Sequence, residues 1–165
     1  MSSIHRLNVS RPQYPGKNPL GIPDLLPELL ADPLGVEVPS LYVCGWTPFT
    51  PVSIQGPNPV FAWWTDDFRF QSTWTKPQNW LPRLAAVQPW AMIEPDHSTY
   101  GSDPPCLQYM AVYMNRWTGR YWQEHGYRVI PNVSWTTPES LTWSLYGIPR
   151  NTPCLAIEVR PKFRP

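Results

Sequence analysis

The chain has 165 residues, a length suited to one domain with a buried core. Charged residues make up 15% of the sequence and the net charge is +1, which argues against a broadly basic nucleic-acid-binding surface. No apolar run reaches the ~18 residues of a membrane-spanning helix, and residues 1–10 lack the apolar stretch of a signal peptide. With three widely spaced cysteines that read as reduced thiols, these features predict a cytoplasmic protein with no membrane partner.

The first third of the chain is rich in proline, which recurs every few residues between positions 12 and 57. Proline fixes the backbone and removes a hydrogen-bond donor, so long helices are not expected there. Residues 24–30 could form one or two helical turns with Asp24 as N-cap, and residues 40–44 could form a short strand. We predict that residues 1–57 are an arm packed on a body formed by residues 58–165.

From residue 58 onward, apolar runs alternate with helical patterns. Strands are predicted at 59–64, 90–93, 127–130 and 154–159, and helices at 76–87, 104–125 and from 137 to about 146. The helix over 104–125 has apolar residues three and four positions apart on one stripe, with Asp103 expected as its N-cap and Gly126 as its end. Pro82 predicts that the helix over 76–87 kinks or starts late.

This alternation predicts an α/β fold of repeating β-α units, because such units force neighbouring strands to run parallel. The expected architecture is a half-barrel, an incomplete (β/α)8-like fold or a small open sheet. In all of these, ligands bind at the C-terminal ends of the strands. Polar segments follow the predicted strands, so that end of the sheet is where we expect a functional site.

Acidic side chains dominate the first two polar segments. Asp66 and Asp67 follow the first strand of the body, and Glu94, Asp96 and His97 follow the next. Converging carboxylates can divide acid and base roles or bind hard divalent cations through oxygen. The catalytic candidates are therefore Asp66, Asp67, Asp96 and His97, and the candidate ligands of Mg²⁺ or Mn²⁺ are Asp66, Glu94 and Asp96. The alternative is that the carboxylates cap helices or pair with arginines, and that His97 is a spectator.

The candidate substrate-binding residues lie on the long helix and after the third strand of the body. They are Asn115, Arg116, Arg120, Asn132, Ser134 and Trp135. Two guanidinium groups on one helix face could clamp a phosphate or carboxylate group. Alternatively, Arg116 reaches a strand-end carboxylate and locks the helix onto the sheet. Gly119, in the middle of the helix, indicates a close approach of its backbone to the sheet.

Four motifs in this order resemble one protein family, the domain-of-unknown-function family numbered 4417, whose members are found in phages, plasmids and prokaryotic genomes. The motifs are Trp64–Phe68, Glu94–Ser98, Asn115–Gln123 and Ile130–Trp135. The resemblance covers about residues 20–160 and implies an origin in a mobile element, but no established activity. Family members continue past the fourth strand, so the resemblance also implies that this chain covers its last strand by another route, with its N-terminal arm or a partner chain.

Two hypotheses about function follow. In the first, the protein is an enzyme with a carboxylate pocket at the strand ends, acting by metal-assisted hydrolysis on a phosphate-containing or other anionic substrate. In the second, it is a non-catalytic accessory protein that binds nucleic acid or a host protein through residues 160–164 and exposed tryptophans. Phosphate-binding loops, nucleophile elbows and zinc-binding His pairs are absent from the sequence, so it supports neither P-loop nucleotide hydrolysis, nor serine hydrolysis, nor zinc proteolysis.

Overall fold

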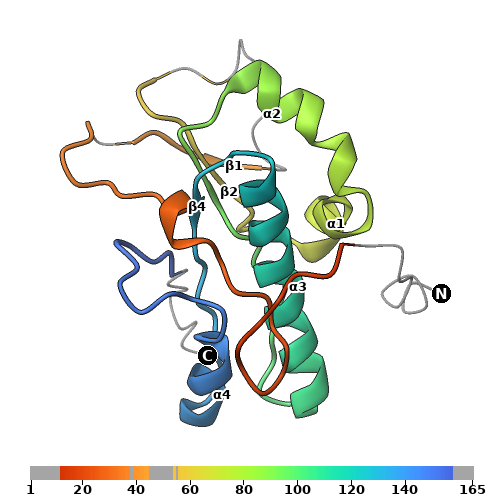
Figure 1. The fold of residues 1–165 in the computed structure, drawn as a ribbon. Helices are drawn as coiled ribbons and strands as arrows, with labels where there is room; N and C mark the ends of the chain where they lie inside the picture. Colours follow the sequence, from red (N-terminus) through yellow and green to blue (C-terminus); the bar gives the residue numbers. More distant parts are fainter. Residues whose placement is uncertain (1–11, 38, 45–53, 55, 158–165) are drawn as a thin grey trace, which may run out of the picture.

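The computed structural model describes residues 12–37, 39–44, 54 and 56–157. Their centre is a sheet of four parallel strands, β1 (Leu41–Val43), β2 (Val60–Ala62), β3 (Ala91–Ile93) and β4 (Val129–Ile130). The strands lie side by side in the order in which the chain forms them (Figure 1). This is the strand order of a (β/α) barrel, but the sheet stays open, so the predicted α/β fold is confirmed as an open parallel sheet.

The register of the strands builds an apolar row across one face of the sheet. Tyr42, Phe61, Met92 and Val129 are direct partners from β1 to β4, and all four belong to or pack against the main hydrophobic core. Because side chains alternate along a strand, their neighbours Val60, Ala62, Ala91 and Ile93 form a second, smaller cluster. All three positions of β2 and of β3 are buried, as expected for strands covered on both faces.

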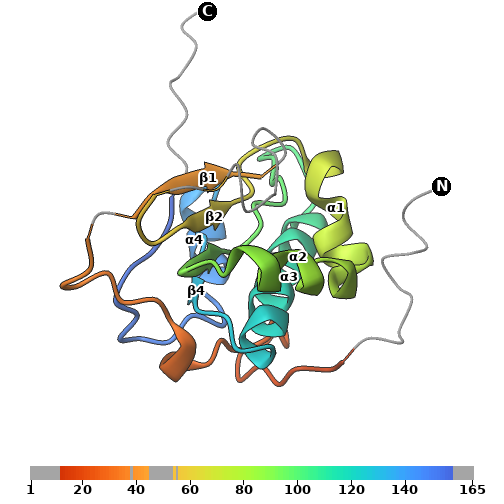
Figure 2. The same cartoon turned by 90° about the horizontal axis from the view of Figure 1, so that it is seen from above.

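Three helices cover the face that carries this row. They are α1 (Asp67–Thr75), α2 (Leu81–Val87) and α3 (Pro105–Glu124), and they lie on one side of the sheet in both views (Figures 1 and 2). Phe70 and Trp74 of α1, Leu84 of α2, and Trp117 and Trp122 of α3 are buried against the strands. The fourth helix, α4 (Pro138–Ser144), packs against α3.

The free edge of β4 is covered by the arm and by the C-terminal part of the described chain. The Ala31 backbone N–H donates to the Val129 carbonyl at 2.9 Å, and Ala156 exchanges backbone hydrogen bonds with Pro131 and Val133 further along. Gln123 of α3 holds the arm in place through hydrogen bonds to the backbone of Leu26 and Leu29. The last strand is therefore covered from within the chain. The strand expected over 154–159 is reduced to one bridge at Ala156, with residues 158 and 159 outside the described chain.

The helices differ from the prediction mainly at their starts. The region expected as one helix over 76–87 follows a separate helix, α1, and contains a 3-10 turn (Pro77–Asn79) and α2, with Pro82 in the first turn of α2. The long helix over 104–125 is confirmed as α3, which gives way to Gly126 at φ 84°.

The two predicted aspartate caps are wrong. Asp24 accepts a backbone hydrogen bond from Lys17, and the short helix of the arm is a 3-10 turn over Pro27–Leu29. The carbonyl of Asp103, and not its carboxylate, accepts a hydrogen bond from the Gln108 side chain. The N-cap residue of α3 is Pro104.

Candidate functional site

The polar segment after β3 begins with Glu94, whose side chain holds the fold together and does not face solvent. Glu94 is fully buried and forms an ion pair with Arg116 of α3, which is 1% exposed. Glu94 also accepts the backbone N–H of Asn132 at 3.0 Å. Arg116 donates further to the carbonyls of Ser144 and Tyr146, beyond β4. This pair therefore ties together β3, α3 and the chain around α4.

Burial lowers the pKa of Arg116 to about 9, because transfer from water disfavours the charged guanidinium group. The contact with the Glu94 carboxylate opposes this effect, so Arg116 remains charged at neutral pH. Its donors are occupied by Glu94 and backbone carbonyls. Of the two alternatives for Arg116, the structure confirms the one in which it locks the helix onto the sheet.

Gly119 is required by the same contact. A Cβ atom built on Gly119 would lie 2.5 Å from Oε1 of Glu94 and 2.8 Å from its Cγ atom. A side chain at this position would push the buried carboxylate away from Arg116. The expectation that Gly119 allows a close approach of the helix to the sheet is confirmed, and the approaching group is the Glu94 side chain.

His97 is also part of the interior, at 2% exposure. Oδ1 of Asn115 accepts the backbone N–H of His97 at 3.0 Å and lies 2.6 Å from Nδ1 of its ring. Because that oxygen can only accept, Nδ1 carries the proton in this arrangement. The ring also packs edge-on against Phe70 of α1. Asn115 thus holds His97 in one orientation and one tautomer, and neither residue lines the cavity described below.

Asp66 and Asp67 take different roles although they are adjacent. Asp66 is exposed and pairs with Arg69 at 3.4 Å on the surface of α1. Asp67, the first residue of α1, accepts the Ser98 backbone N–H at 3.1 Å and the Ser98 hydroxyl at 2.9 Å. Asp67 therefore anchors the loop that follows β3 to the start of α1.

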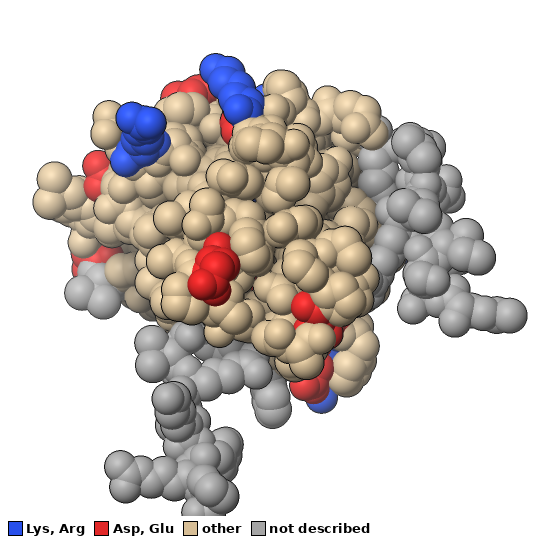
Figure 3. Space-filling model, turned by 90° about the horizontal axis from the view of Figure 1, so that it is seen from below, with Lys and Arg blue, Asp and Glu red and all other residues tan. Residues whose placement is uncertain are grey.

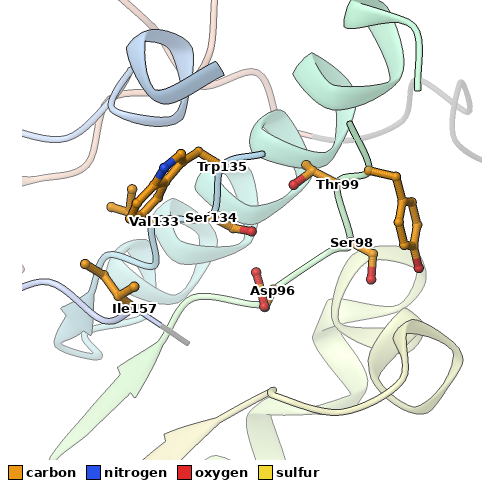
Figure 4. A pocket seen from close by; sticks show the side chains of 8 residues that line it. Asp96, Ser98, Thr99, Val133, Ser134, Trp135 and Ile157 are labelled. Carbon is orange, nitrogen blue, oxygen red and sulfur yellow. The ribbon is translucent and has the colours of Figure 1, made fainter. Parts of the chain in front are cut away.

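A cavity of about 380 Å³ opens where β3 and β4 end (Figure 4). Its wall is made by the loops that follow these two strands and by one residue of the C-terminal segment. The lining residues are Asp96, Ser98, Thr99, Tyr100, Val133, Ser134, Trp135 and Ile157. We call this cavity the strand-end pocket. Figure 4 shows the Asp96 side chain between Ser134 on one side and Ser98 on the other.

Asn132 positions the one carboxylate of this lining. Its side-chain Nδ2 donates to Oδ1 of Asp96 at 2.9 Å, while its backbone N–H is held by Glu94. Asn132 is 2% exposed, so it supports Asp96 from behind the wall. Asn132 therefore links the buried ion pair of Glu94 and Arg116 to the Asp96 carboxylate in the pocket wall.

The structure brings together only part of the predicted site. Asp96, Ser134 and Trp135 line the strand-end pocket and Asn132 supports it. The other candidates lie outside the lining; they are Asp66, Asp67, Glu94, His97, Asn115, Arg116 and Arg120, the last of which is bound to Glu124 and to the Asp24 carbonyl. The lining residues that were not among the candidates are Ser98, Thr99, Tyr100, Val133 and Ile157. Thr99 and Tyr100 directly follow the Glu94–Ser98 motif, so extending that motif by two residues would have found them.

The predicted metal ligands do not converge. Asp66 is exposed just before α1, Glu94 is buried against Arg116, and Asp96 is bound to Asn132. Within the described part of the chain, no three His, Cys, Asp or Glu side chains are grouped so that they could hold a metal ion. The set Asp66, Glu94 and Asp96 is therefore corrected: burial of Glu94 with an arginine removes it from any shared centre with the other two.

A known protein family matches most of the chain. The model of the family described as Domain of unknown function (DUF4417) matches residues 14–159. The chain belongs to the DUF4417 family. The resemblance predicted from the strand-end motifs is thereby confirmed, and the match extends over the arm as well as the body. No solved structure matches the chain.

Two curated relatives are phage proteins. The Gene 1 proteins of Mycobacterium phage D29 and Mycobacterium phage L5 are each 39% identical to the chain over 84 residues. These residues are 51% of the chain but only 30% and 36% of the two relatives, so the alignment spans about a third of their length. The relatives agree with the phage setting that the resemblance implied. Their names state no activity.

The described surface and helices bear on the expected nucleic-acid and membrane partners. On the face drawn in Figure 3, Lys and Arg side chains are scattered and do not gather into a patch. The basic segment proposed for nucleic-acid binding, residues 160–164, lies outside the described residues. Within the described chain, no helix combines the length and the apolar character needed to cross a membrane.

Proposed function

We propose that this DUF4417 protein binds a small polar molecule in the strand-end pocket. The observation that carries the proposal is the composition of the lining, which joins one oriented carboxylate and three aliphatic hydroxyl groups to the rings of Tyr100 and Trp135. Ligand pockets of proteins typically measure ~300–1,000 Å³ and combine apolar walls with a few placed polar groups. A cavity of about 380 Å³ falls within this range.

The position of the pocket supports the same proposal. In open parallel sheets, ligands bind in crevices outside the carboxyl ends of the strands. The strand-end pocket lies at that end of β3 and β4, and all of its lining residues except Ile157 come from the loops that directly follow these strands. Asp96 is the one Asp, Glu or His side chain in the described lining, so it is the candidate acid or base for any reaction there.

Metal-assisted hydrolysis of an anionic substrate finds less support. The described lining contains no Lys or Arg side chain, and both arginines expected to clamp an anion are bound elsewhere. The described lining therefore offers an anion no Lys or Arg side chain. We propose instead a polar ligand contacted by Asp96, Ser134 and Trp135.

A ligand screen with matched variants tests this function. Saturation-transfer NMR with a library of small ring compounds should give hits on the native protein that disappear in Trp135→Ala. The control is Phe68→Ala, which removes an even more exposed ring (72% against 42% for Trp135) from α1 outside the pocket and should keep every hit. Hits that survive in Trp135→Ala, or a library without hits, would refute the proposal.

A further inference from the structure

We infer that the ligand of the strand-end pocket is a neutral sugar ring and that the hydroxyl group of Thr99 binds it directly. The inference rests on the proposed function and adds the class of the ligand and one residue that selects it. Three features of the pocket carry it: the buried hydroxyl group of Thr99, the kind of polar group in the lining, and the apolar surface at the opening.

The first feature is the side chain of Thr99, which is part of the lining. Its Oγ1 atom is buried, and no hydrogen bond joins it to any residue of the described chain. A buried polar group without a partner is costly, and in native proteins nearly all such groups are satisfied by protein, water or a ligand. In Figure 4 the hydroxyl oxygens of Thr99 and Ser134 point toward the same space between the two loops. A molecule bound in the pocket against Thr99 can therefore supply the missing partner.

The second feature is the chemistry of the polar side chains. Apart from Asp96 and the indole N–H of Trp135, those in the described lining all end in a hydroxyl group; they are Ser98, Thr99, Tyr100 and Ser134. A hydroxyl group can both donate and accept, so this set matches a ligand that carries several hydroxyl groups of its own.

The side chains that recognise other ring compounds are missing from the same wall. The described lining contains no Asn, Gln, Lys or Arg. These are the side chains that read the edges of nucleobases and hold phosphate groups. The lining therefore favours a neutral sugar over a nucleotide or a sugar phosphate.

The third feature is the apolar surface at the opening of the cavity. Trp135, Ile157 and Tyr100 are 42%, 46% and 60% exposed, and all three belong to the lining. Figure 4 shows Val133 and Ile157 beside the ring of Trp135. The face of an aromatic ring carries partial negative charge, so it packs well against the C–H groups on the flat side of a sugar. The pocket thus offers apolar surface to that side and hydroxyl groups to the rim of the sugar.

A small set of probes tests the class of the ligand. The methyl glycosides of glucose, galactose, mannose and N-acetylglucosamine are screened against the native protein by saturation-transfer NMR, together with phosphorylated glucose, uracil and adenine. At least one methyl glycoside should bind at millimolar concentration, and it should bind more tightly than the phosphate and the two bases. Its dissociation constant is then measured by titration.

Variants at Thr99 test the contact with the ligand. Thr99→Val removes the hydroxyl group and keeps the branched shape of the side chain, so it should weaken binding of that glycoside about three- to tenfold, the worth of one neutral hydrogen bond. Thr99→Ser keeps the hydroxyl group and should retain most of the affinity. Ser134→Ala removes the other hydroxyl group that points into this space, should also weaken binding, and remains informative if Thr99→Val does not fold.

Thr65→Val is the matched control. Thr65 is also a half-buried threonine whose Oγ1 atom has no partner in the described chain, but it lies outside the lining. The same substitution there should leave the affinity at its native value. Thermal melts confirm that each variant is folded.

The outcomes separate the inference from the function it rests on. The inference is overturned if no methyl glycoside binds, if a base or the phosphate binds more tightly, or if Thr99→Val keeps the native affinity. In any of these cases, library hits that disappear in Trp135→Ala would leave the proposed function standing. A library without hits would remove both.

Discussion

Replacing Arg116 with methionine should remove a large part of the stability of this protein. The substitution keeps a long apolar side chain but leaves Glu94, which is fully buried, without its cationic partner. Removing one member of a buried ion pair costs about 3–5 kcal/mol, because the other charge stays in the interior. Folded domains have only ~5–15 kcal/mol of stability in total. Arg116→Met also leaves the carbonyls of Ser144 and Tyr146 without a donor, so the upper part of this range is expected.

The assay is equilibrium unfolding by urea and by heat. At the length of this chain, each kcal/mol lowers Tm by roughly 2–4 °C, so Arg116→Met should melt about 6–20 °C below the native protein. Arg69→Met is the matched control: the same substitution at a surface pair with Asp66 should cost less than about 1 kcal/mol.

The pH dependence distinguishes a lost charge partner from a packing defect. In Arg116→Met, the buried Glu94 carboxyl group would take up a proton on folding, because burial disfavours its charged form. The folded state then binds more protons than the unfolded state, so the deficit relative to the native protein should shrink as pH falls from 7 to 5. A stability deficit of Arg116→Met below about 1 kcal/mol, or a deficit that does not change with pH, would refute the role given to this pair.

Three other substitutions test local features of the fold. Gly119→Ala should destabilise by about 1–3 kcal/mol in urea unfolding, because its Cβ atom would collide with the Glu94 carboxylate, whereas Gly101→Ala has room and should be near neutral. Thr137→Ala removes the hydroxyl that caps α4 and should cost about 1 kcal/mol by the same measurement. Burial raises the pKa of Tyr14 to about 12, so the native protein should lose stability as pH rises from 10 to 12, and Tyr14→Phe should lose less.

Strands buried on both faces were the easiest elements to predict. Every position of β2 and β3 is buried, so both appear in the sequence as uninterrupted apolar runs. The segment 154–157 misled the prediction because its apolar residues Leu155 and Ile157 are 45% and 46% exposed and do not face a core. Hydrophobic pattern reports which residues are apolar, but not whether the fold supplies a surface to cover them.

The strand-end pocket lies where the sequence led us to expect a site, but only some of its lining residues were among the candidates. Parallel strands bring their carboxyl ends together, so polar residues after β3 and β4 had to meet. Which of them would face solvent depended on partners far away in the chain. Arg116 lies 22 positions after Glu94, and Asn132 lies 36 positions after Asp96. The sequence alone does not show that Glu94 is paired with an arginine in the interior while Asp96 lines a cavity.

The buried ion pair and the strand-end pocket are physically connected, so the ion pair supports the wall of the proposed binding site as well as the fold. Glu94 accepts the backbone N–H of Asn132, and the side chain of the same asparagine orients Asp96. A substitution at Arg116 should therefore weaken ligand binding even where the protein still folds, since Glu94 would shift and carry Asn132 with it. By contrast, Asp67 supports the opposite wall through Ser98 and does not touch the ion pair. The two supports are independent, so Asp67→Asn should loosen that wall while leaving the link from Arg116 to Asp96 intact.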